Sequence, residues 1–191
     1  MRKTIGLALF LLGIFNSTHA YIFKVGPRLG ISASRIKLNE TLTKCYDPEI
    51  GLGYQIGILG RVDFPIVYIQ PELLFTDSKV KYKCPNQHYI LQYKKIELPI
   101  LFGMKILEIG RIQLGPIFSF LLSAKNDTID ISSNCKTITA GYQVGIGVDI
   151  LRLMIDLKYE GSLSKVCTKV ADVAVDHRKS LFILSVGVNL L

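Results

Sequence analysis

The sequence predicts an all-β fold in which eight antiparallel strands close into an up-and-down barrel. Three observations support this prediction. Apolar residues recur at every second position in eight segments, polar gaps of alternating length separate these segments, and no run of 18 apolar residues follows residue 20. Because successive side chains of a strand point to opposite faces, each segment has one apolar face and one face of small and polar residues.

The N-terminal segment predicts export. A basic start precedes an apolar run over residues 5–15, which is too short to span a bilayer and is followed by small residues at Thr18 and Ala20. We therefore expect a signal peptide over residues 1–20 and a single β-barrel domain over residues 21–191.

The eight strands are predicted from the alternation itself. In chain order, the apolar positions run at every second residue from Phe23 to Ala33, Leu52 to Ile58, Val67 to Phe75, Ile96 to Met104, Ile112 to Leu122, Ala140 to Ile150, Leu153 to Tyr159 and Phe182 to Leu190. Four prolines lie within the predicted strands, and each lacks the backbone N–H group that would donate a hydrogen bond to a neighbouring strand. We expect local bulges at Pro27, Pro71, Pro99 and Pro116.

The connections alternate in length. Long polar gaps at 37–49, 79–89, 124–136 and 161–178 contrast with tight turns at 63–66, 107–110 and 151–152. An even strand count, with long loops at one rim and short turns at the other, is typical of a transmembrane barrel of the bacterial outer membrane. We therefore expect a monomer in the cell outer membrane, with both termini periplasmic and the long loops extracellular.

A soluble eight-stranded barrel of the lipocalin type is the competing interpretation. It has the same period with the two faces reversed. The bulky apolar residues of eight strands would overfill so narrow an interior, and the polar face, with stretches such as residues 51–57 and 141–147, has too little charge for a solvent face. Both observations favour the membrane barrel.

Several short motifs carry a family resemblance. They are Gln70-Pro71-Glu72-Leu73-Leu74-Phe75, Ile96-Glu97-Leu98-Pro99-Ile100-Leu101, Gly115-Pro116, Gly145-Ile146-Gly147-Val148 and Asp156-Leu157-Lys158-Tyr159-Glu160-Gly161-Ser162-Leu163. In this order the motifs resemble the PorT-like outer-membrane β-barrel family of Bacteroidetes. The resemblance implies a porin-like barrel. Since the family's namesake is associated with the type IX secretion system, it also makes secretion-system proteins candidate partners.

The inward face carries the candidate site. Counting along the strands places five charged residues at similar mid-barrel height, with Gln55 and Gln143 nearby: Arg28, Glu72, Glu97, Asp156 and Lys158. Unpaired charges there would be costly, so the balance of signs predicts a paired network. The network is either a structural plug or a narrow polar conduit whose pairs part transiently.

One cysteine falls in each predicted long loop, at Cys45, Cys84, Cys135 and Cys167. Export makes disulfides the expectation. Pairing of neighbouring loops favours Cys45–Cys84 with Cys135–Cys167, Cys45–Cys167 with Cys84–Cys135 is also feasible, and the crossed pairing is least favoured. A metal site near His88 or His177 is the alternative, but the CxxC spacing of zinc sites is missing, and we expect no metal and no cofactor.

Positive charge gathers where the long loops begin and end, and the formal net charge is +8. The residues concerned are Lys37, Lys44, Lys79, Lys81, Lys83, Lys94, Lys95, Lys125, Lys136, Lys165, Lys169, Arg178 and Lys179. They are either ordinary solvated lysines and arginines or contacts to the phosphates of lipopolysaccharide. An exported barrel is a poor candidate for nucleic-acid binding.

An enzymatic role has little support in the sequence. After cleavage of the signal peptide only His88 and His177 remain as histidines, and no GxSxG motif accompanies them. We therefore expect a non-enzymatic structural or accessory component of the outer membrane, with a narrow diffusion channel as the alternative.

Overall fold

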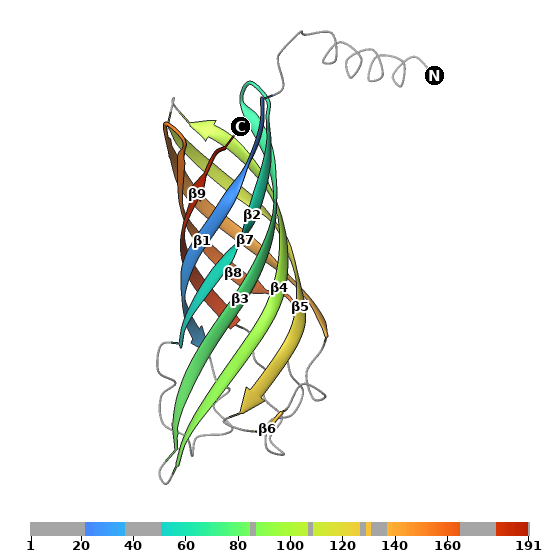
Figure 1. Ribbon diagram of the computed structural model, residues 1–191, viewed down its shortest axis with the longest axis vertical. Coiled ribbons are helices and arrows are strands. Elements are labelled where there is room, and N and C mark those ends of the chain that lie inside the picture. Colours follow the sequence, from blue (N-terminus) through green and yellow to red (C-terminus); the bar gives the residue numbers. More distant parts are fainter. Residues whose placement is uncertain are drawn as a thin grey trace, which may run out of the picture.

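The computed structural model describes residues 22–36, 51–84, 87–106, 109–126, 129–130, 137–164 and 179–190. Eight long strands wrap into one closed antiparallel barrel, which confirms the predicted fold class (Figure 1). They are β1 (Ile22–Ile36), β2 (Gly51–Asp63), β3 (Val67–Cys84), β4 (Gln87–Ile106), β5 (Gly110–Asn126), β7 (Ile138–Ile150), β8 (Leu153–Ser162) and β9 (Lys179–Val188). A two-residue strand, β6 (Ile129–Asp130), pairs with the end of β5.

The barrel closes between the first and last strands. β1 pairs with β9 from Arg28↔Gly187 to Ile36↔Lys179, and every other long strand pairs with two neighbours. Beyond the end of β9, the amide of Leu190 donates a hydrogen bond of 2.9 Å to the carbonyl oxygen of Val25. Closure leaves none of the eight long strands with an unpaired edge, as a sheet surrounded by hydrocarbon requires.

The two faces of the wall differ in polarity. Large apolar side chains point outward, as shown by Leu29, which is 58% exposed, beside Arg28, which points inward and is 1% exposed. The same alternation holds on the other long strands. This arrangement is the reverse of a soluble barrel, so the lipocalin-like alternative is wrong: a carrier in water would place its apolar face inside. No helix among the described residues is long and apolar enough to cross a membrane.

The tight turns lie at one rim, together with the described ends of the chain at Ile22 and Leu190 (Figure 1). In the β2–β3 turn, the amide of Phe64 donates to the carbonyl oxygen of Val67 at 2.9 Å. In the β7–β8 turn, Leu151 adopts a left-handed φ of 56°. We call this end of the barrel the tight-turn rim.

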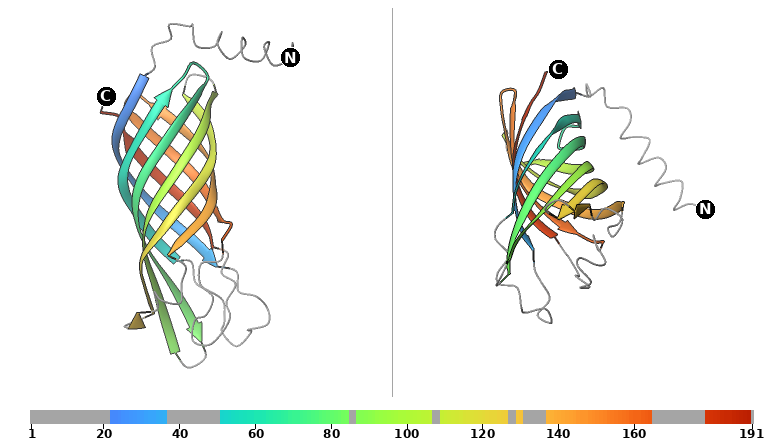
Figure 2. Two further views of the ribbon diagram at one scale, coloured as in Figure 1. Left: turned by 90° about the vertical axis from the view of Figure 1, so that its right-hand side faces the viewer. Right: turned by 60° about the horizontal axis from the view of Figure 1, so that its bottom comes forward.

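One predicted loop is wrong. Residues 79–84 and 87–89 continue the strands: the pairing of β3 with β4 runs from Val80↔Leu91 to Cys84↔Gln87. The hairpin therefore extends farther from the tight-turn rim than the other strands (Figure 2). The sequence of the hairpin alternates lysines with strand-forming residues. Because the lysines are charged, the composition favoured a solvated loop over a paired strand.

The predicted bulges at the prolines are also wrong. The register is the same on both sides of each proline, as in β3–β4, where Pro71↔Ile100 and Leu74↔Glu97 belong to one register. Ladder pairs are lost locally, but no residue is inserted. The register shift recorded in the described sheet lies instead between Lys94 and Lys95, where the facing strand β5 carries Leu122 as an extra residue.

Candidate functional site

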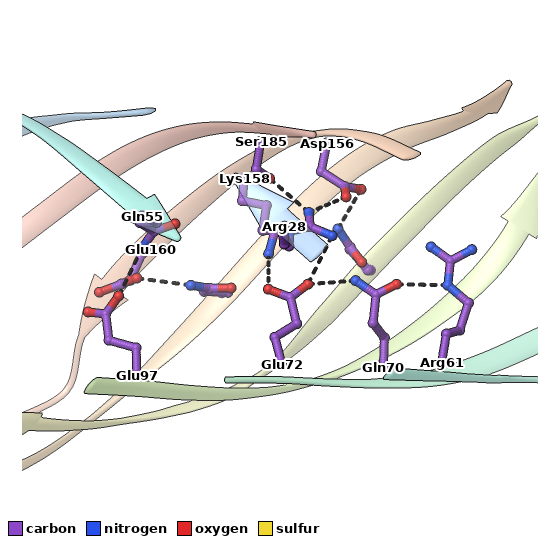
Figure 3. Close-up of polar contacts among 12 residues, drawn as sticks. Arg28, Gln55, Arg61, Gln70, Glu72, Glu97, Asp156, Lys158, Glu160 and Ser185 are labelled. Carbon is purple, nitrogen blue, oxygen red and sulfur yellow. Dashed lines mark hydrogen bonds and ion pairs between the residues drawn. The ribbon is translucent and has the colours of Figure 1, made fainter. Parts of the chain in front are cut away.

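The barrel lumen holds the candidate site, because its inward positions bring acids and bases together where solvent is excluded. Four of the residues singled out in the sequence form one group, which we call the central network: Arg28 on β1, Glu72 on β3, and Asp156 and Lys158 on β8 (Figure 3). Each of the four is at most 2% exposed.

Two cations and two anions alternate in the central network. Glu72 receives both cations: its Oε2 lies 2.8 Å from Lys158 Nζ and its Oε1 lies 3.2 Å from Arg28 Nη1. Arg28 Nη2 donates to the carboxylate of Asp156 and, at 2.8 Å, to Ser185 Oγ. Paired in this way, the four buried charges offset much of the cost of leaving water.

The Lys158–Glu72 pair crosses the lumen. β3 pairs with β2 and β4, whereas β8 pairs with β7 and β9, so the two residues belong to strands that do not touch in the sheet. Figure 3 shows their side chains meeting from opposite sides. The ion pair therefore fastens one wall of the barrel to the other.

Glycine makes room for this packing. A Cβ placed on Gly147 of β7 would lie 2.2 Å from Asp156 Oδ1 and 2.7 Å from Arg111 Nε. Gly147 is the register partner of Asp156 on β8. A close approach of two charged side chains to backbone is what requires glycine at this position.

Toward the tight-turn rim, amide and guanidinium groups continue the network. Arg61 Nε donates to Gln70 Oε1 at 2.7 Å, and Gln70 Nε2 donates to Glu72 Oε1 at 2.6 Å. Arg61 also pairs with Asp149 at 2.7 Å. The guanidinium of Arg61 stacks on the ring of Tyr68, 4.4 Å from its centroid.

A second branch leaves Asp156. Its Oδ1 accepts hydrogen bonds from Arg111 Nη2 at 2.7 Å and from Gln113 Nε2 at 2.9 Å. Arg111 in turn pairs with Asp149, the acid that also holds Arg61. The two branches therefore meet, and the tight-turn half of the lumen contains one connected ring of charges.

The tight-turn rim itself carries a smaller group. Asp63 lies between two lysines, with Lys24 Nζ 2.8 Å from Oδ2 and Lys105 Nζ 3.2 Å from Oδ1. The lysine side chains are 22% and 33% exposed, so this group borders the solvent.

Glu97 does not join the central network. It pairs with Lys95, accepts hydrogen bonds from Gln55 Nε2 at 2.9 Å and Thr76 Oγ1 at 2.5 Å, and lies 3.5 Å from the Ser119 hydroxyl. We call these five residues the Glu97 cluster. Gln143 also differs from expectation, because its Nε2 donates to Glu160 Oε2 at 2.9 Å. The central network and the Glu97 cluster thus lie in different layers of the lumen, and Lys95 of the cluster also interacts electrostatically with Glu160.

Sequence reasoning missed several members of these groups: Arg61, Asp63, Arg111, Asp149 and Glu160. The signal that could have found them is the same alternation, since all five occupy inward positions of predicted strands or their direct extensions. Only charged residues at mid-barrel height were considered for the predicted network, and these five residues lie nearer to the rims.

The cysteines are placed only in part. Cys84 ends β3, and Cys45, Cys135 and Cys167 lie outside the described residues, as do His177 and the expected signal peptide. The disulfide pairing stays a prediction. No group of three or more potential metal ligands occurs among the described residues.

Apolar side chains fill the lumen around the charged groups. Leu74, Leu101, Ile117, Met154 and Ile183 all point inward and are at most 2% exposed. No histidine or cysteine side chain is described in the lumen. The arrangement can hold two walls together and exclude water.

The comparisons agree with this architecture. The family model described as "Outer membrane protein beta-barrel domain" matches residues 18–167. A crystal structure of Ail, the attachment invasion locus protein of Yersinia pestis, in complex with the heparin analogue sucrose octasulfate, superimposes with a TM-score of 0.55 at 15% identity, covering 88% of this chain and 99% of Ail. Neisserial surface protein A superimposes with a TM-score of 0.53 at 15% identity, covering 90% of this chain and 100% of that one. A search of curated proteins gives no significant match.

Proposed function

Because the chain belongs to the outer membrane protein β-barrel domain family, we propose that it is a non-enzymatic structural or accessory barrel whose lumen the central network keeps closed. One observation carries this proposal: the Lys158–Glu72 ion pair joins opposite walls of the barrel at 2.8 Å. A water-filled channel needs a continuous polar path, and here buried ion pairs and apolar side chains occupy the same cross-section.

The lengths of the connections support a proposed orientation in the membrane. In barrels of this membrane the short turns face the periplasm and the longer connections face outward. The tight-turn rim would then be periplasmic, together with both termini, and the extended β3–β4 hairpin would be extracellular. A protease added outside intact cells should cut in the long connections and leave the tight turns intact.

The closed state can be tested by conductance. Purified barrel inserted into planar bilayers is expected to show no steady current. As a comparison, the double variant Glu72→Ser/Lys158→Ser removes the pair that crosses the lumen, whereas Lys95→Ser/Glu97→Ser removes a pair within one wall. We expect a larger leak from the first variant than from the second. Steady, ion-selective steps from the unaltered protein would instead support the narrow porin-like channel.

The PorT-like motifs support a narrower proposal, that the barrel assists type IX protein secretion. Deletion of the gene should then reduce the proteins released into the medium, and complementation should restore them. An unchanged set of secreted proteins would leave the general structural role standing and remove the secretion link.

A further inference from the structure

A group of exposed lysines lies on the outer face of the barrel, at the end opposite the tight-turn rim. We call it the lysine patch: Lys79 on β3, Lys94 on β4 and Lys125 on β5. The register places Lys79 beside Gln92 and Gln92 beside Lys125, while Lys94 occupies the next outward position of β4. Since neighbouring strands lie about 4.8 Å apart, Lys79 and Lys125 are separated by about 10 Å at the backbone.

The bulge in β5 helps to assemble the lysine patch. Leu122 is the extra residue, and beyond it Ser123 pairs with Lys94 and Ala124 with Tyr93. Ala124 and Tyr93 are buried, whereas Lys125 is exposed. Without the extra residue the alternation would direct position 125 inward, so the bulge brings the third lysine to the outer face.

Two acids occupy register positions beside the lysine patch: Asp77 pairs with Lys94, and Asp130 of β6 pairs with Lys125. Asp77 is 6% exposed and accepts two hydrogen bonds from Gln92 Nε2, at 3.0 and 2.9 Å. Among the residues whose side chains are described, which do not include Asp130, no carboxylate lies within ion-pair distance of the Lys79, Lys94 or Lys125 ammonium groups. The three lysines of the patch therefore outnumber the two acids beside them, which leaves a formal excess of one positive charge.

The lysine patch borders the apolar band directly. The next outward row toward the tight-turn rim is Phe75, Ile96 and Phe120, which pair across the same three strands. On other strands, the described outward positions at this end of the barrel are apolar or aromatic, as at Leu52, Tyr54, Ile138, Tyr142 and Phe182. Among the side chains described at this end, the exposed lysines lie on one side of the barrel, immediately above a surface that suits acyl chains.

We propose that the lysine patch binds the phosphate groups of a glycolipid of the outer leaflet, the lipid A part of lipopolysaccharide, with the acyl chains packed on the row below. Charge complementarity and continuity with the lipid-facing band support this occupant. Ammonium groups beside an anionic membrane surface contribute roughly a fivefold gain in binding each. The inference rests on the proposed orientation, because phosphorylated glycolipid meets only the extracellular end.

The test measures lipid A binding to the folded barrel in detergent by native mass spectrometry. Each single variant, Lys79→Gln, Lys94→Gln and Lys125→Gln, should weaken retention roughly fivefold, and the triple variant should weaken it more. Arg152→Gln, which removes an exposed cation from the tight-turn rim, is the matched control and should leave retention unchanged. Heat-modifiable gel migration verifies that every variant is folded.

Three outcomes would overturn the proposal. They are equal retention by the triple variant and the parent, equal retention of a dephosphorylated lipid A, and lysine-dependent binding of sucrose octasulfate without retention of lipid A. The last would reassign the patch to a soluble polyanion. None of these outcomes affects the conductance result, so failure here is distinguishable from failure of the closed-barrel proposal.

Discussion

The central network and the Glu97 cluster are both buried and charged, but they connect different parts of the wall. The Glu97 cluster draws its members from consecutive strands: Gln55 on β2, Thr76 on β3, Lys95 and Glu97 on β4, and Ser119 on β5. The central network joins β3 to β8 across the lumen. The hydrogen bonds and the ion pair of the Glu97 cluster therefore join neighbouring strands, although Lys95 also interacts electrostatically with Glu160 on β8. The central network, in contrast, has a direct ion pair between opposite walls.

The difference also appears in how each carboxylate is neutralised. Glu72 holds two cations whose side chains are each 1% exposed, so neither has access to water. Glu97 holds Lys95, whose side chain is 12% exposed. Loss of the carboxylate should strand the partners of Glu72 more completely than the partner of Glu97.

The largest effect is therefore expected for Glu72→Ala. Removing the carboxylate leaves Arg28 with only Asp156 as an ion-pair partner. It also leaves Lys158 without the Glu72 Oε2 atom that lies 2.8 Å from its Nζ. A buried charge stranded in this way costs about 3–5 kcal/mol of unfolding free energy. Urea unfolding in lipid vesicles, followed by heat-modifiable gel migration, measures the loss.

The control for this variant is Glu72→Met with Lys158→Met, which removes an anion and a cation together. The double variant should lose much less stability than Glu72→Ala, because no lysine is left unpaired. Equal losses would mean that packing volume, and not charge pairing, makes Glu72 important.

An intermediate effect is expected for Gly147→Ala. The added methyl group would collide with Asp156 Oδ1 and Arg111 Nε, and these atoms cannot move freely because each is held by ion pairs. Overpacking of this kind costs about 2 kcal/mol. Gly60→Ala is the matched control, since the atom nearest to its Cβ is Pro71 Cγ at 4.0 Å. Similar unfolding free energies for the two variants would argue against close packing around Asp156.

The alternation predicted which way each strand faces, but not how the groups meet across the lumen. Whether a strand residue faces inward or outward follows from the local alternation of side chains. The sequence alone therefore predicts that Arg28, Glu72, Asp156 and Lys158 face inward. Contact between Lys158 and Glu72 depends on the stagger of strands 86 residues apart in the chain. Glu97 illustrates the limit: it pairs with Leu74, two residues farther from the tight turn than Glu72, and therefore belongs to another layer.

The β3–β4 hairpin and the bulge show a second limit. Lysines alternating with strand-forming residues are compatible with either a solvated loop or a paired edge, and composition alone favoured the loop. The extra residue Leu122 leaves no mark in the hydrophobic pattern, because leucine also suits the ordinary outward position. The extension of the hairpin and the position of the bulge both depend on pairing between strands, which is a tertiary property.

The smallest effect of the three is expected for Glu97→Ala. Lys95 can extend toward the water that it already contacts, and Gln55 Nε2 keeps its hydrogen bond of 3.2 Å to Thr76 Oγ1. The remaining loss is that of charge-assisted hydrogen bonds, about 1.5 kcal/mol. The unfolding free energy is measured under the same conditions as that of Glu72→Ala, so the two losses can be compared directly. A loss as large as that of Glu72→Ala would show that bracing one wall matters as much as joining two, and would remove the distinction between the two groups.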